Sequence, residues 1–84
     1  MKKLQQDLLD NNEKLVFGSN KNMKLLLNDK LQRIYLAKNC NDAYKINVKK
    51  QARNTEVVEL EVPNTEVGVI CKKPFSISVI GLSK

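Results

Sequence analysis

Residues 17–27, FGSNKNMKLLL, run from an apolar segment through one glycine and a cluster of amide and lysine side chains into an apolar helical stripe. This stretch decides the fold because it predicts a strand end, a turn and a helix start, one directly after another. The turn, residues 18–22, contains no acidic residue. Ser and Asn suit a helix N-cap, but a glycine turn leading into a helix N-terminus also suits an anion. The stretch alone leaves both interpretations open.

Hydrophobic periodicity on either side of this stretch predicts an alternation of helices and strands. We expect helices at residues 2–10, 20–28, 41–53 and 64–72, and strands at residues 15–17, 32–38, 55–62 and 74–82. This order, αβαβαβαβ, is typical of helices packed on both faces of a sheet. The sequence therefore predicts an α/β fold, a three-layer α-β-α sandwich with a four-stranded mixed sheet, and one domain over residues 1–84.

Local patterns predict which faces of these elements are buried. Leu4, Leu8 and Leu9 lie on one side of the first expected helix, which should pack on the sheet. The strand at residues 55–62 alternates glutamate with valine and leucine, so we expect it to have one solvated face. The final strand alternates from Phe75 onward, and this pattern favours a core position for the ring of Phe75 as much as an exposed one.

Helix capping residues are also visible in the sequence. Ser19 or Asn20 is expected to cap the second helix, and Asn64 or Thr65 the fourth. The third helix should begin at Asn41 with an acid in its first turn.

The charge balance points to an acidic partner. The formal net charge is +6, from 15 Lys and Arg against 9 Asp and Glu, which is typical of nucleic-acid-binding domains of this size. More than half of the acids lie between Asp42 and Glu66, so this part of the chain should face away from a polyanion. No apolar run approaches the ~20 residues that span a bilayer, and residues 1–12 lack the apolar core of a signal peptide. We expect a cytoplasmic protein with no membrane partner.

Among the possible functions, the residue types present support an enzyme least. The chain has no histidine, no paired carboxylates outside one strand and no nucleophile–base pair, so nothing supplies acid–base chemistry. Cys40 and Cys71 lack CxxC spacing and any histidine partner for zinc. We expect no enzyme, no metal, no cofactor, no small-molecule substrate, and two reduced, packed thiols. Cys40 precedes a helix start, where a thiol pKa can be lowered, although burial as a small apolar residue is the alternative.

Three basic turns have the composition of a nucleic-acid contact. The turns at residues 18–21 and 38–41 follow parallel strands, where ligands gather in alternating α/β chains. The turn at residues 72–74 joins them only if the last strand runs antiparallel to the first two. The shared rim would then present Lys21, Lys24, Lys38, Lys72 and Lys73, the amides of Asn20, Asn22 and Asn39, and the ring of Phe75. Such a rim suits RNA with unpaired bases, and a merely solvated lysine face is the alternative.

Three segments, in order, resemble a known family. They are KLVFGSNKNMKLL at residues 14–26, RIYLAKNC at residues 33–40 and NTEVGVICKKPFSISVIGL at residues 64–82. They are similar to the small RNA-binding ribosomal proteins of the L30e and L7Ae group, and the LAKNC and KPFS pieces lean towards the L30e branch. The resemblance covers nearly the whole chain. It implies an α-β-α sandwich that binds kink-turn RNA, an internal loop with a sharp bend and tandem sheared G·A pairs, usually in ribosomal RNA.

The resemblance also implies roles for individual residues. Gly18 would let the backbone approach RNA, Asn20 and Lys21 would lie at the G·A pairs, Lys24 would meet phosphate, and Asn39 would match the loop asparagine after the second strand. The L7Ae branch has glutamate where this chain has Lys21. Lysine cannot accept a hydrogen bond from a guanine edge, so specificity is expected to differ most at this position.

The third segment would supply the contact to the bend of the RNA. Phe75 matches an aromatic residue that stacks on the flipped-out base, while Val69, Ile70 and the turn at residues 72–74 would shape the loop beside it. Rim and resemblance together give the expected RNA-binding residues: Gly18, Ser19, Asn20, Lys21, Lys24, Lys38, Asn39, Val69, Ile70, Lys72, Lys73, Pro74 and Phe75.

The expected function is that of an RNA-binding ribosomal protein of the large subunit. Its partners would be structured RNA, with ribosomal RNA favoured, and other ribosomal or ribonucleoprotein components, and the free protein would be a monomer. The alternative is a non-ribosomal scaffold of the same fold that acts through a protein partner or within another ribonucleoprotein complex.

Overall fold

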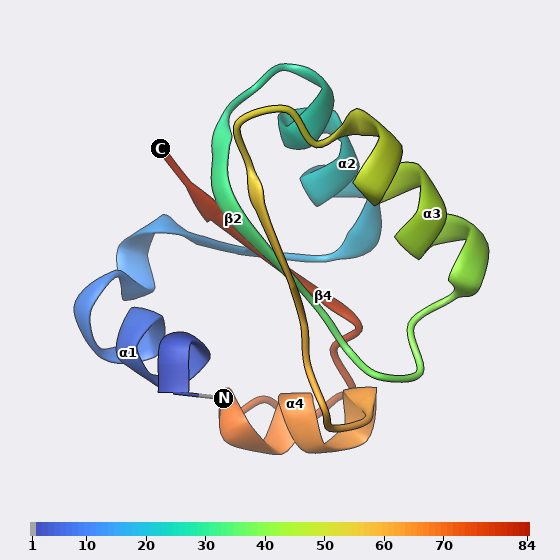
Figure 1. Ribbon diagram of the computed structural model, residues 1–84. Coiled ribbons are helices and arrows are strands. Elements are labelled where there is room, and N and C mark those ends of the chain that lie inside the picture. The colour runs from blue at the N-terminus through green and yellow to red at the C-terminus, as the bar shows by residue number, and fades with distance from the viewer. Residues whose placement is uncertain (1) are drawn as a thin grey trace.

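The computed structural model describes residues 2–84. The elements, in chain order, are α1 (Lys2–Asp10), a short 3-10 helix η1 (Asn12–Lys14), β1 (Leu15–Phe17), α2 (Ser19–Leu27), β2 (Leu31–Leu36), α3 (Asp42–Gln51), β3 (Glu56–Glu59), α4 (Asn64–Ile70) and β4 (Val79–Ser83). Apart from the additional η1, this is the predicted αβαβαβαβ order (Figure 1).

The four strands form one mixed sheet in the order β1-β4-β2-β3. Strand β4 runs antiparallel to both β1 and β2, whereas β2 and β3 are parallel. The carboxyl ends of β1 and β2 therefore lie at the same edge of the sheet as the amino end of β4. This orientation of β4 is the condition under which the three basic turns were expected to meet.

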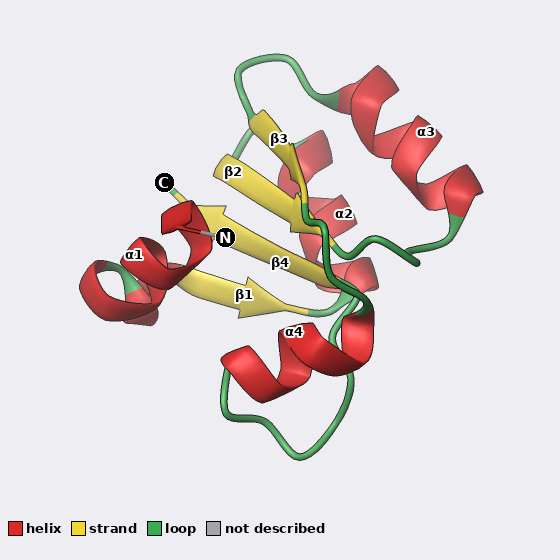
Figure 2. Ribbon diagram, turned by 60° about the horizontal axis from the view of Figure 1, so that its bottom comes forward, coloured by secondary structure: helices red, strands yellow, loops and turns green. Residues whose placement is uncertain are grey.

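Helices cover both faces of the sheet, as predicted. Figure 2 shows α1 and α4 on one face and α2 and α3 on the other. Because successive side chains of a strand point to opposite faces, Tyr35 of β2 packs with Leu4 of α1 and Val67 of α4, while its neighbour Ile34 packs with the α2 and α3 side. Two separate cores result, one on each face of the sheet.

Strand β3 differs from the prediction of one solvated face. Val57 packs against the core beneath α2 and α3, and Val58 packs against the opposite core. Glu56 and Glu59 are exposed because they stand at the two ends of this edge strand. The two valines of β3 therefore pack on opposite faces of the sheet, and its apolar side chains are not confined to one face.

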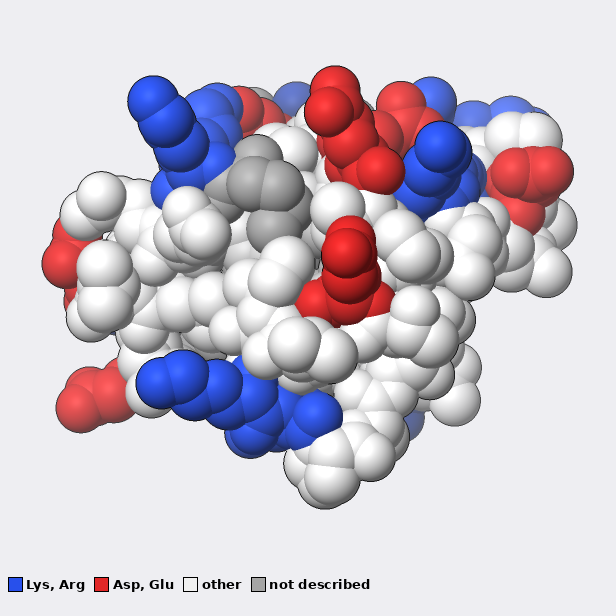
Figure 3. Space-filling view, turned by 90° about the horizontal axis from the view of Figure 1, so that it is seen from below, with Lys and Arg blue, Asp and Glu red and all other residues white. Residues whose placement is uncertain are grey.

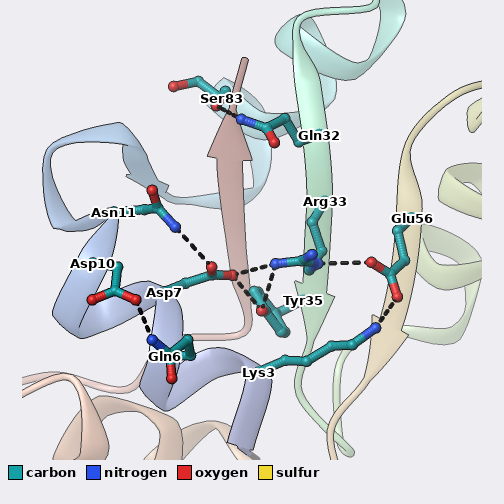
Figure 4. Close-up of polar contacts among 10 residues, drawn as sticks. All are labelled: Lys3, Gln6, Asp7, Asp10, Asn11, Gln32, Arg33, Tyr35, Glu56 and Ser83. Atoms are coloured by element: carbon teal, nitrogen blue, oxygen red, sulfur yellow. Dashed lines mark hydrogen bonds and ion pairs between the residues drawn. The ribbon is translucent and has the colours of Figure 1, made fainter.

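Helix α1 buries an acid in place of one expected leucine. Leu4 is buried, but Leu9 is 82% exposed, so its predicted position on the packed face is wrong. Asp7 is buried, and its carboxylate accepts hydrogen bonds from the hydroxyl of Tyr35 and, at 2.7 Å, from Nη1 of Arg33. Figure 4 shows this cluster fastening α1 to β2, with Glu56 bridging Arg33 to Lys3.

The Asp7 cluster makes stability depend on acid pH. Burial alone would raise the pKa of Asp7, but hydrogen bonds from Tyr35, Arg33 and Asn11 outweigh it and hold that pKa below its ordinary value. The contribution of Asp7 is therefore fully present above its unfolded-state pKa of about 4 and is lost as the pH falls below it.

Replacing Asp7 by asparagine is accordingly expected to lower the free energy of unfolding at pH 7 by about 2 kcal/mol, because the charged acceptor of these bonds is lost. Urea unfolding at pH values from 7 to 2.5 should show wild type and D7N converging in stability as the pH falls below about 4. A constant difference across the whole range would contradict this assignment.

The predicted final strand is too long at its start. Residues 72–78 are irregular, and β4 begins only at Val79. The backbone N–H groups of Lys73 and Ile77 donate to carbonyl oxygens of Gly68 and Asn64 in α4, at 2.9 and 3.0 Å. These bonds to α4 replace the strand ladder that simple alternation would predict.

The two cysteines are free and buried. Burial raises the pKa of the Cys40 thiol, so the alternative of a lowered pKa at a helix start is wrong. Burial also raises the pKa of the Cys71 thiol. Within residues 2–84, none of the helices has the length and hydropathy needed to span a membrane.

Candidate functional site

The three basic turns meet at one edge of the sheet, as the antiparallel β4 requires. We call this the three-turn edge: Gly18–Lys21, Lys38–Asn41 and Lys72–Phe75. The segment that leads into β4 links them, because the N–H of Gly18 donates to Val79 O at 3.3 Å and the N–H of Ala37 donates to Ser78 O at 2.9 Å. Side chains separated by more than fifty positions in the sequence are thus brought together.

The first turn takes its shape from Gly18 and Asn22. Gly18 has φ of +115°, a conformation that side-chain-bearing residues rarely adopt. Asn22 is fully buried, and its Nδ2 donates to the carbonyl oxygens of Gly18 and Val16 at 2.7 and 3.0 Å. The expectation that Asn22 offers its amide at the rim is therefore wrong. Its side chain is committed to holding the turn from inside.

Helix α2 begins without a side-chain cap. Its N-cap residue is Gly18, and no side chain accepts a hydrogen bond from the first turn, so capping by Ser19 or Asn20 is not found. Ser19, Asn20 and Lys21 are all exposed, as is Lys24 in the next turn of the helix. The first-turn N–H groups and these side chains are left for solvent or a ligand.

The second turn is fastened to α4 by a pair of amides. Asn39 Oδ1 accepts from the backbone N–H of Asn64 at 2.8 Å, and Asn39 Nδ2 donates to Asn64 Oδ1 at 3.2 Å. Asn39 thus supplies the acceptor at the start of α4 that was expected from Asn64 or Thr65. The predicted start of α3 is confirmed, since Asn41 Oδ1 accepts from the N–H of Tyr44.

The third turn exposes its aromatic ring. Lys72 has φ of +57°, and the side chains from Lys72 to Phe75 are exposed, with 57% of Phe75 accessible. The alternative of a core position for Phe75 is thereby excluded. The third turn packs closely on α4: a Cβ added at Gly68 would stand 2.1 Å from the carbonyl oxygen of Phe75, so the position requires glycine.

A groove of about 340 Å³ lies between the first and third turns. Two aromatic residues, Phe17 and Phe75, are among those that line it, and Lys73 Nζ lies 5.1 Å from the centroid of the Phe17 ring. The remaining lining residues are Gly18, Ser19, Ser76, Ile77, Ser78 and Val79. The groove therefore combines aromatic walls, hydroxyl groups and a nearby cation.

Two of the predicted site residues lie on α4, away from this groove. Val69 is 72% exposed. Ile70 is partly buried against the core beneath α1 and lines a separate groove of about 630 Å³ with Leu8, Leu9 and Lys72. The structure thus groups Gly18, Ser19 and Phe75 directly and leaves Ile70 and Lys72 beside the groove on the α1 side.

The rim lysines, Lys21, Lys24, Lys38, Lys72 and Lys73, are absent from the ion pairs found among residues 2–84. Those ion pairs involve Lys3, Arg33, Lys49 and Lys84. Figure 3, the view from below onto α4, shows Lys or Arg side chains along the lower margin and at the upper left and right, and acidic side chains at the centre, the upper margin and the sides of this face. Lys38 marks the limit of the basic region, because it lines a surface hollow with Glu59 and Glu61.

Sequence patterns missed several residues of this site. Phe17 was expected only as the end of a buried strand, yet its ring lines the groove. Asn64 was expected only as a helix cap, but it is hydrogen-bonded to Asn39 of the second turn. Tyr44, which was not expected at this site, is hydrogen-bonded to Ser19 of the first turn and Asn41 of the second. For Tyr44, a polar residue in the first turn of a helix that follows a predicted ligand-binding turn is the signal that could have found it.

A family model described as "Ribosomal protein L7Ae/L30e/S12e/Gadd45 family" matches residues 1–84. The chain is 32% identical over 69 residues to the large ribosomal subunit protein eL30 of Methanosarcina mazei, covering 82% of this chain and 65% of the relative. It is also 32% identical over 71 residues to the eL30 protein of Sulfurisphaera tokodaii, covering 82% and 67%. The chain thus spans about two thirds of the length of these curated relatives.

Solved structures share the fold at low sequence identity. A protein of unknown function from Bacillus halodurans superimposes with a TM-score of 0.79 at 16% identity, covering 95% of this chain and 81% of that one. A 15.5 kD RNA-binding protein from Giardia lamblia superimposes with a TM-score of 0.68 at 15% identity, covering 88% and 63%.

Proposed function

Because the chain belongs to the ribosomal protein L7Ae/L30e/S12e/Gadd45 family, we propose that it binds structured RNA of the kink-turn type through the three-turn edge. The curated relatives are named as large-subunit ribosomal proteins, which supports ribosomal RNA as the target and the ribosome in the cytoplasm as the place of action. The RNA-binding protein from Giardia lamblia has the same fold.

The observation that carries this proposal is the groove between the first and third turns. Its aromatic lining suits an unpaired base, which stacks on a ring face. The rim lysines beside it are not engaged in the ion pairs found in residues 2–84, so they can meet phosphates. A bent RNA with a flipped-out base would offer both groups at once.

The predicted residues in the first and third turns take roles from their positions at this edge, whereas Val69 and Ile70 would contact RNA from α4. In the proposal, exposed Phe75 stacks on the extruded base, and Lys73, whose Nζ lies over the neighbouring Phe17 ring, meets a phosphate. Asn20 reads a base edge from the exposed first turn of α2, and Gly18 lets the RNA backbone come close. The remaining proposed contacts are Ser19, Lys21, Lys24, Lys38, Asn39, Val69, Ile70, Lys72 and Pro74. For Asn39 the contact has to come from its exposed side, since its amide is paired with Asn64.

The test is binding to two RNAs that differ only at the bend. One is a kink-turn with its tandem G·A pairs, and the other has those pairs replaced by Watson–Crick pairs. Fluorescence anisotropy at several salt concentrations should show tighter binding to the kink-turn throughout. Equal affinity for the two RNAs would overturn kink-turn recognition, and no binding to either would overturn the RNA function and favour a scaffold with a protein partner.

Replacing Asn20 by alanine separates a base contact from a helix cap. We expect N20A to weaken kink-turn binding by about 1–3 kcal/mol, the usual value of a specific base contact, with almost no change in the unfolding midpoint, because Asn20 makes no cap bond. Lys38→Ala is the matched control and should weaken both RNAs alike. Loss of stability of about 1 kcal/mol without loss of selectivity would mean that Asn20 acts as a cap.

A further inference from the structure

Tyr44, in the first turn of α3, is hydrogen-bonded to two of the turns at the three-turn edge. Its Oη donates to the carbonyl oxygen of Ser19 in the first turn, 2.7 Å away. Its backbone N–H donates to Oδ1 of Asn41 in the second turn, 3.1 Å away. A single residue thus connects two turns that lie more than twenty positions apart in the sequence.

The ring of Tyr44 packs against the core on the α2 and α3 side of the sheet. It is partly buried against the core formed by residues such as Leu26 and Val48, and α2 and α3 lie side by side on the same face of the sheet (Figures 1 and 2). Burial raises the pKa of the Tyr44 hydroxyl to about 12. The hydroxyl therefore remains a hydrogen-bond donor at every physiological pH.

The first turn has few other restraints. Among residues 2–84, the side-chain hydrogen bonds to its backbone come from Asn22, which reaches Gly18 from inside, and from Tyr44, which reaches Ser19 from the α3 side. Its backbone is also held by the bond from the N–H of Gly18 to Val79 O, and Ser19 to Lys21 form the uncapped start of α2. The two side chains fix the turn from opposite sides.

From this geometry we infer that Tyr44 is a positioning residue for RNA recognition, which sets the Gly18–Lys21 turn against the Lys38–Asn41 turn before RNA arrives. The inference rests on the proposed function. The Tyr44 hydroxyl acts on a protein carbonyl, so its effect on RNA passes through the turn. A turn that is already ordered binds more tightly, because less conformational freedom is lost on binding.

Tyr44→Phe tests the inference because it keeps the ring and its packing and removes only the hydroxyl. Tyr35→Phe is the matched control: it also removes one tyrosine hydroxyl, but that hydroxyl donates to buried Asp7 on the α1 side of the sheet. For both variants we would measure the dissociation constants for the kink-turn RNA and for its Watson–Crick counterpart, together with the thermal unfolding midpoint.

We expect Y44F to weaken kink-turn binding by about three- to tenfold, as the loss of one hydrogen bond allows, and to leave binding of the Watson–Crick RNA nearly unchanged. Y35F should lower the unfolding midpoint. The ratio of its dissociation constants for the two RNAs should remain as in wild type. If wild type discriminates between the RNAs and Y44F does so equally well, the inference is overturned while the proposed function stands. If wild type binds neither RNA, both are overturned.

Discussion

Replacing Gly81 by alanine is expected to destabilise the protein by about 3 kcal/mol or more, the upper range for overpacking a closed core. Gly81 lies in β4, paired with Val16 of β1 and Ile34 of β2. A Cβ added there would stand 1.7 Å from Oδ1 of Asn22 and 3.0 Å from a methyl carbon of Leu31. At roughly 4–8 °C per kcal/mol for a domain of this size, the unfolding midpoint should fall by at least about 12 °C.

The loss of stability is large because the Asn22 side chain cannot move away from the new Cβ without breaking its own hydrogen bonds. Its Nδ2 holds the carbonyl oxygens of Val16 and Gly18, and its Oδ1 is buried without a hydrogen-bond partner among the described residues. Moving this side chain would release both backbone oxygens and with them the first turn of the three-turn edge. The substitution therefore damages the sheet and the proposed RNA site together.

A double variant identifies the clash. Asn22→Ala removes the atoms that the new Cβ would meet, so Gly81→Ala with Asn22→Ala should be about as stable as Asn22→Ala alone. Chemical denaturation of wild type, the two single variants and the double variant gives the coupling free energy between positions 22 and 81. If the two single losses simply add, the collision lies elsewhere in β4 and Asn22 is not its cause.

This pair also shows why the sequence predicted the turn but misplaced Asn22. The order of elements follows from local periodicity, which predicted the strand before this turn and the helix after it. The sequence pattern predicts that Asn22, a polar residue in a lysine-rich helix turn, is exposed. Its true surroundings depend on Gly81, fifty-nine positions later, and no local pattern contains that contact. An isolated glycine inside a strand was the available sign of a close approach.

The same limit applies at Asp7 and at Phe75. Asp7 is buried because Tyr35 and Arg33 on the neighbouring strand satisfy its carboxylate, which helix periodicity cannot foresee. Phe75 is exposed because α4 takes the hydrogen bonds of the segment around it. The meeting of the three turns was predictable, since it needs only the direction of β4. Which side chains at that edge touch RNA remains a prediction.

Replacing four rim lysines, Lys21, Lys24, Lys38 and Lys73, by glutamine is expected to lower the affinity for kink-turn RNA about a thousandfold. Each charged contact to phosphate contributes on the order of 1 kcal/mol or more. The salt dependence should change as well. About five lysine–phosphate contacts give a slope of log affinity against log salt near −4, and removing four of them should leave a slope of about −1.

The matched control removes four lysines elsewhere: Lys14, Lys30, Lys50 and Lys84. Lys14, Lys30 and Lys84 flank the opposite ends of β1, β2 and β4, and Lys50 lies in the last turn of α3. Both variants lose the same four positive charges from a chain of net charge +6, so a general electrostatic attraction would be weakened equally in the two. We expect the control to keep a slope near −4 and most of the wild-type affinity. Equal losses in the two variants would mean that RNA is attracted by the whole surface and that the three-turn edge is not its binding site.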